Sequence, residues 1–128
     1  MSVDEISLTL PADEEFHGVA HLVLGGLAVR LDLSYEHLED LELALDAVLE
    51  RCDGDGEVTM RVRVLDGALE TAVGPFGESL RAELARAADD SLGLRRILGA
   101  VCDHFEITQG DGGDWIELTK RVEKRGGD

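Results

Sequence analysis

Asp40-Leu-Glu-Leu-Ala-Leu-Asp-Ala-Val-Leu-Glu-Arg-Cys52 is the stretch of this chain that says most about its fold. Apolar residues recur in and just before it at intervals of mostly three and four residues, at Leu38, Leu41, Leu45, Val48, Leu49 and Cys52. This spacing places them on one face of an α-helix. We therefore expect an amphipathic helix that buries this face against a core.

The sequence before this helix predicts one strand and one further helix. Ile6, Leu8 and Leu10 alternate with polar residues, which is typical of a strand. Asp13 is a candidate N-cap for a helix that runs to about Leu31 and has Phe16, Val19, Ala20, Val23 and Leu27 inside. Gly25 and Gly26 lie within that helix and predict a kink or a close helix contact, because glycine disfavours a helix interior. Ser34 is a candidate cap for the second helix.

The sequence after this helix predicts hairpins and two more helices. Residues 58–64 alternate as a half-buried strand, Asp66-Gly67 signals a hairpin turn, and residues 68–73 return before Gly74-Pro75-Phe76-Gly77 breaks the strand. Residues 78–88 look helical, and a helix from about Leu92 is expected to bury Leu94, Ile97, Leu98, Val101 and Phe105. Ile107 begins a strand, residues 110–113 turn, and residues 115–122 form the last strand. This order predicts an α+β two-layer sandwich, with helices on one face of a mostly antiparallel sheet.

The composition is that of an ordinary globular domain. The chain has 128 residues, 44% hydrophobic and 31% charged, which suits one domain over residues 1–122 and a flexible tail over residues 123–128. There is no apolar run long enough to span a membrane, and the first five residues are acidic rather than basic. We expect a cytoplasmic protein.

The charge of the chain is strongly negative, at −16. Nucleic-acid binding relies on Lys and Arg, so direct contact with nucleic acid is not expected. Residues 36–55 contain eight acidic residues and one basic residue, Arg51. Such a stretch favours a basic partner surface, and we take Glu36, Glu39 and Asp40 as a candidate partner surface. The alternative is a well-solvated acidic exterior with no partner.

The residue types needed for catalysis or metal binding are sparse. Cys52 and Cys102 lie on apolar faces and are interpreted as buried free thiols rather than a disulfide. His17 and His21 share a helix face and have a spacing that can bind a metal, but surface histidines are the favoured reading. No nucleophile motif occurs. We therefore name no catalytic residue and no metal site.

The helix from Asp40 to Cys52 resembles the first ATP-binding box of the histidine-kinase-like (GHKL) ATPase superfamily, in its anti-sigma factor/serine-protein kinase branch. In that family the helix carries a Glu and, four residues on, an Asn that holds the magnesium of ATP. The alignment puts Ala47 at the Glu position and Arg51 at the Asn position. Asp46 and Glu50 are the carboxylates left nearby.

Three other segments carry the resemblance and depart from it in the same way. Where the family has Asp-x-Gly-x-Gly for adenine, this chain keeps Gly74 but has Ala72 and Phe76. Residues 91–97 resemble the second glycine box, with Gly93, Leu94 and Ile97 matching and Ser91 replacing a glycine. The closing strand has Asp114 and Trp115 where the family has Thr.

The resemblance implies the histidine-kinase-like ATPase (Bergerat) fold with a vestigial nucleotide pocket. Its residues are Asp46, Ala47, Glu50, Arg51, Ala72, Gly74, Gly93 and Leu94. It further implies a bacterial regulator of transcription that binds a sigma factor or an antagonist protein, without ATP or magnesium as a favoured cofactor. The alternatives are an ATP-binding serine kinase that phosphorylates an antagonist protein, and a purely structural module. Family relatives often dimerise, so a homodimer is also implied.

Overall fold

A computed structural model describes residues 5–31, 33–51, 56–65, 67–77, 94–110 and 112–121. The strands are β1 (Glu5–Pro11), β2 (Glu57–Leu65), β3 (Ala68–Phe76), β4 (His104–Gly110) and β5 (Gly113–Arg121). The helices are the 3-10 turn η1 (Glu14–Phe16) and the α-helices α1 (His17–Leu31), α2 (Tyr35–Leu49) and α4 (Leu94–Val101).

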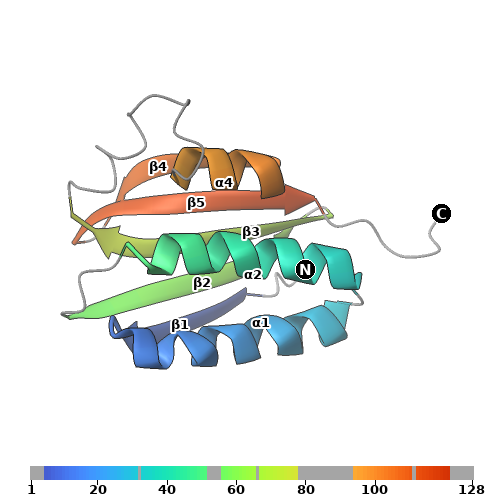
Figure 1. Cartoon of the computed structure of the whole chain (residues 1–128), viewed down its shortest axis with the longest axis horizontal. Helices are drawn as coiled ribbons and strands as arrows, with labels where there is room; N and C mark the ends of the chain where they lie inside the picture. The colour runs from blue at the N-terminus through green and yellow to red at the C-terminus, as the bar shows by residue number, and fades with distance from the viewer. Residues whose placement is uncertain are drawn as a thin grey trace.

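The strands form one antiparallel sheet in the order β1-β2-β3-β5-β4. The described α-helices all lie on one face of it, with α1 in front of β1, α2 beside it, and α4 toward β5 and β4 (Figure 1). This confirms the predicted α+β two-layer sandwich. We call the other side of the sheet, which none of the described helices covers, the open face.

The core lies between the helices and the sheet, as the alternation of the strands requires. Its largest fully buried side chains are Leu45, Leu69, Leu94, Leu98, Ile116, Val48, Val62 and Val73. Burying one such side chain stabilises the fold by roughly 2 kcal/mol. The helix quoted first therefore does what its spacing predicts, because Leu41, Leu45 and Val48 are all buried.

Both predicted helix caps are present. The Asp13 carboxylate accepts a hydrogen bond from the Glu15 backbone N–H at 3.1 Å. The Ser34 hydroxyl accepts one from the backbone N–H of His37, also at 3.1 Å. Each satisfies a donor that the first turn of a helix leaves unpaired.

The buried face of α1 differs from the prediction. Phe16 and Val19 are each 37% exposed, and the buried positions are Ala20, Leu24, Leu27 and Ala28. The residues predicted to start this helix form the separate turn η1. The buried face of the helix was therefore assigned from the wrong first residue.

Within the described residues, the glycines of α1 neither interrupt the helix nor pack closely against another helix. The helix continues through Gly25 and Gly26 to Leu31. A Cβ added at Gly18, Gly25 or Gly26 would meet nothing within 4 Å. Glycine in a helix interior is less favourable than alanine by about 1 kcal/mol. No packing contact within the described residues offsets this loss of stability.

Two strand boundaries also differ from the prediction. β3 continues through Gly74 and Pro75 to Phe76, because a register shift against β5 accommodates this segment. Phe105 lies in β4 rather than in a helix, since His104 already pairs with Thr119 of β5.

Cys102 follows α4 and has a free thiol that is partly buried. Burial raises the pKa of this thiol to about 11, so it stays protonated near neutral pH, as a structural cysteine does. The other cysteine, Cys52, lies outside the described residues, as do Asp66 of the predicted hairpin turn, the predicted helix over 78–88 and the tail over 123–128.

Candidate functional site

The resemblance places the magnesium of ATP at the end of α2. Arg51 lies just beyond this helix, and its guanidinium Nη1 donates to the Ala47 carbonyl at 2.8 Å. The same nitrogen lies 3.6 Å from Glu50 Oε1. Ala47 itself is buried. The cationic side chain is thus folded back along its own helix.

Asp46 is engaged with α1. Its Oδ1 lies 2.6 Å from His21 Nε2, and His21 Nδ1 lies 3.6 Å from Glu42 Oε2. The two carboxylates are one helical turn apart on α2, so one imidazole reaches both. His21 therefore fastens α1 to α2 and is the partner that the sequence analysis missed, because a contact across 25 positions leaves no local signal.

The other predicted pocket residues are not gathered around this helix end. Ala72 lines a hollow on the open face, in register with Arg61, on the opposite side of the sheet from α2. Leu94 is fully buried in the core at the start of α4. Gly93 lies outside the described residues. Of the predicted set, the structure brings together Asp46, Ala47, Glu50 and Arg51.

The resemblance assigns Gly74 to the close approach of a nucleotide, but in the structure Gly74 makes room for a packed side chain. A Cβ at Gly74 would come within 2.6 Å of the Trp115 indole, and a Cβ at Gly110 would do the same. The indole thus lies across two strands at positions where only glycine leaves room. The guanidinium carbon of Arg61 stands 4.8 Å from the ring centroid, a cation–π distance.

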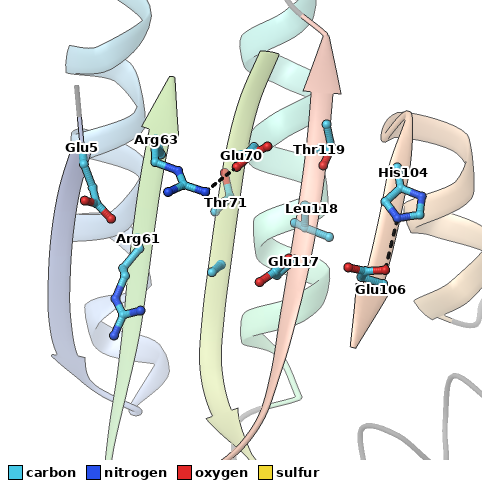
Figure 2. A pocket seen from close by; sticks show the side chains of 11 residues that line it. Glu5, Arg61, Arg63, Glu70, Thr71, His104, Glu106, Glu117, Leu118 and Thr119 are labelled. Atoms are coloured by element: carbon cyan, nitrogen blue, oxygen red, sulfur yellow. Dashed lines mark hydrogen bonds and ion pairs between the residues drawn. The ribbon is translucent and has the colours of Figure 1, made fainter. Parts of the chain in front are cut away.

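The open face carries two rows of charged and polar side chains, and Figure 2 shows them on the five strands. Strand register aligns Glu5, Arg63, Glu70, Thr119 and His104 in one row, and Arg61, Ala72, Glu117 and Glu106 in the next. Arg63 pairs with Glu70 at 2.9 Å. A shallow hollow of about 340 Å³ lies between the rows. Its walls are polar, and the side chain at its floor, that of Ala72, is small.

The predicted partner surface on α2 is only partly available. The Lys120 ammonium donates to Asp40 Oδ2 at 2.9 Å and to the Val101 carbonyl at 2.9 Å. Asp40 is therefore a structural anchor that ties α2 to β5 and to the end of α4. Glu36 and Glu39 are exposed, and hydrogen bonding to Glu39 raises the pKa of Tyr35.

No group of three or more His, Cys, Asp or Glu side chains within the described ranges is arranged to hold a metal ion. Among the described helices, none has the length and apolar character needed to span a bilayer.

Sequence comparison finds bacterial relatives named serine-protein kinase RsbW. The Bacillus velezensis protein is 33% identical over 85 residues, which cover 61% of this chain and 53% of the relative. The Bacillus pumilus protein is 29% identical over 142 residues, which cover 93% of this chain and 86% of the relative. These similarities support the anti-sigma factor/serine-protein kinase branch of the histidine-kinase-like ATPases as the group that this chain resembles.

A solved structure supports the same fold for this RsbW-like chain. The crystal structure of the RsbU and RsbW domains of Rv1364c from Mycobacterium tuberculosis matches with a TM-score of 0.70 at 18% identity, covering 93% of this chain and 32% of that one. No protein-family model matches the sequence. The chain spans about half the length of several curated relatives, including those from Bacillus velezensis and Listeria innocua.

Proposed function

We propose that this RsbW-like chain is a regulator that acts by binding a protein partner, and that its α2 helix no longer holds magnesium-ATP. The observation that carries the proposal is Arg51. It occupies the position at which the family pattern has the metal-binding Asn, and it donates to the Ala47 carbonyl at 2.8 Å. Magnesium takes oxygen ligands in octahedral geometry, and a guanidinium offers none. The residues at this helix end do not fit the ion.

Two neighbouring observations support the same conclusion. The Asp46 carboxylate, which sequence alone leaves as a substitute ligand, is engaged by His21 at 2.6 Å. Ala47 has no polar side chain at the position of the family's Glu.

A sigma factor or an antagonist protein is the partner class that the relatives support. On this chain, Glu36, Glu39 and Tyr35 form the exposed part of the acidic surface at the start of α2. Two carboxylates beside an exposed aromatic ring suit a partner that presents basic side chains. The net charge of −16 would speed the approach of such a partner. Asp40 is left out of this surface because Lys120 holds it.

Titration calorimetry with ATP and magnesium tests the nucleotide part. We expect no binding heat at millimolar ATP, with the Bacillus pumilus relative titrated alongside as the reference. A micromolar dissociation constant for this chain would overturn the proposal. It would instead support the second candidate function, a serine kinase, which the names of the relatives favour. Transfer of labelled phosphate from ATP to a serine of a co-purifying protein would establish that kinase.

Pull-down from the native cell extract tests the partner surface. We expect the double variant Glu36→Lys/Glu39→Lys to lose a partner that the unchanged chain retains. The matched control is Glu15→Lys/Glu57→Lys, which makes the same charge change at two exposed positions outside α2. Equal capture by both variants would remove the acidic surface from the proposal.

A further inference from the structure

The hollow on the open face is lined by opposite charges that stand on different strands. Its volume of about 340 Å³ lies within the range of small-molecule pockets. Arg61 and Arg63 of β2 stand on one side of it, and Glu117 of β5 and Glu106 of β4 stand on the other (Figure 2). The hollow therefore has a cationic wall and an anionic wall.

One of the two arginines is already engaged. The Arg63 guanidinium donates to Glu70 Oε1 at 2.9 Å. Hydrogen bonding to Glu70, together with the charges of Glu70 and Glu5, raises the pKa of Arg63. This row of the sheet satisfies its own cation, so the charges that remain for a ligand are those of the next row.

The next row holds a cation and a carboxylate that do not reach each other. Within the described residues, Arg61 pairs with no carboxylate, and its guanidinium carbon stands 4.8 Å from the Trp115 ring centroid. Glu117 has no ion pair in the same part of the chain, and it acts on Arg63 through charge alone. Ala72 stands between Arg61 and Glu117 in the register of the strands. Since neighbouring strands are about 4.8 Å apart, this small side chain leaves a gap two strand spacings wide.

Two carboxylates on the anionic wall oppose each other directly. Glu106 is in register with Glu117 across β4 and β5, and like charges at opposed positions destabilise a sheet. His104 Nε2 lies 3.4 Å from Glu106 Oε1. A positively charged ligand group placed against the two carboxylates would remove their repulsion.

Charge matching selects the class of ligand. Arg61 suits a carboxylate, which a guanidinium binds through two parallel hydrogen bonds. Glu117 and Glu106 suit ammonium groups. A free amino acid with an amine in its side chain carries all three charges on one short molecule, whereas a simple amine or a simple acid lacks at least one of them.

We propose that Arg61, Ala72, Glu117 and Glu106 form a binding site, the open-face site, for a free diamino acid of the lysine type. The ligand carboxylate lies on Arg61, its α-ammonium group on Glu117 and its side-chain ammonium group on Glu106. Ala72 forms the floor beneath it. The open-face site lies on the opposite side of the sheet from α2, so it goes beyond the proposed partner binding and does not depend on it.

Titration calorimetry of the full chain with L-lysine tests the open-face site. Emission from Trp115 is a second readout, because Arg61 stands beside this indole. We expect a dissociation constant of about 1 mM or lower. Two probes each lack one charge: cadaverine is lysine without its carboxylate, and ε-aminocaproate is lysine without its α-amino group. Each should bind at least about tenfold more weakly than lysine, since one charge-assisted hydrogen bond is lost.

Paired variants assign the charges to their residues. Arg61→Met should weaken lysine binding about tenfold and leave cadaverine binding unchanged, whereas Glu117→Gln should weaken both about tenfold. The matched controls are Arg96→Met on α4 and Glu15→Gln in η1, two exposed positions that do not line the hollow. Both controls should bind lysine as the unchanged chain does. Ala72→Leu fills the floor and should abolish binding, and thermal unfolding checks that each variant is folded.

Three results would overturn the proposal. The first is the absence of binding heat at tens of millimolar L-lysine. The second is equal affinity for lysine and cadaverine, because the ligand carboxylate would then make no contact. The third is equal weakening of lysine and cadaverine by Arg61→Met, which would show that this residue supports the sheet and does not bind the ligand.

Discussion

Helices α1 and α2 have the same length of 15 residues, lie side by side on the same sheet, and differ in almost everything that faces water. α2 carries five acidic residues, and three of them face basic groups on other elements, Asp40 facing Lys120 and both Glu42 and Asp46 facing His21. α1 carries no acidic residue, and its outer side presents Leu22, Val29 and glycine.

This difference shows that two helices of the same layer can have different roles. Three acidic residues of α2 tie it to neighbouring elements, and Glu36 and Glu39 stay exposed. α1 makes its polar contact through His21 toward α2, so its outer side is left apolar. Substitutions in α2 should therefore change the stability of the domain, and substitutions on the outside of α1 should leave it nearly unchanged.

The largest contrast is expected between two leucines. Leu45→Ala on α2 should lower the free energy of unfolding by about 3 kcal/mol, because it opens a cavity in the core. Leu22→Ala on α1 should change it by less than about 0.5 kcal/mol, since this side chain is exposed. Urea denaturation at a concentration that keeps the chain monomeric measures both. Equal losses would show that the outer side of α1 is part of the core and would break the comparison.

Lys120→Met should lower the free energy of unfolding by about 1–2 kcal/mol. It leaves the Val101 carbonyl unpaired and Asp40 without its cation, in a setting that is only partly solvated. The control is Arg63→Met, which breaks the exposed pair with Glu70 and should cost less than about 0.5 kcal/mol. Similar losses in thermal unfolding would show that the α2 anchor is no stronger than a surface ion pair.

Gly25→Ala should raise the free energy of unfolding of the monomer by about 1 kcal/mol. The added methyl group meets open space, so only the gain in helix propensity is felt. Thermal unfolding at low concentration measures this. A loss of stability would mean that an unseen close contact covers this glycine, and the distinction between the two helices would have to be redrawn.

The smallest effect concerns the polar end of α2. Glu39→Gln should lower the pKa of Tyr35 toward its ordinary value of 10.0, because the carboxylate hydrogen bond and charge that raise it are removed. Tyr35 is the sole tyrosine of the chain, so absorbance of the phenolate during an alkaline titration reports it directly. Glu36→Gln serves as the control and should leave the midpoint nearly unchanged.

Much of the fold could be predicted from the sequence, and α2 illustrates why. Its apolar residues recur at helical spacing over several turns, and Ser34 marks its start, so local pattern and tertiary burial agree. The buried face of α1 was predicted less well, because this helix has apolar residues and glycines on all of its sides. With no polar face to orient the helix, the pattern could not distinguish the buried Leu24 from the exposed Leu22.

The candidate site was predicted less completely than the fold. The grouping of Asp46, Ala47, Glu50 and Arg51 follows from one helix and was predicted. The position of Ala72 on the open face was not, because motif alignment does not say to which side of a strand a residue points. Contacts such as His21 with Asp46 join distant segments, so only the folded chain shows them.

Trp115 has a practical consequence as the sole tryptophan of the chain. Its indole lies on the open face over Gly74 and Gly110, next to Arg61, whereas Tyr35 stands on the helix layer. The two chromophores therefore report on opposite sides of the sheet. Emission from Trp115 senses events at the sheet surface, and absorbance of Tyr35 senses events at the helices. When both signals are recorded during binding, they show which side of the sheet a binding partner contacts. No added dye or substitution is needed.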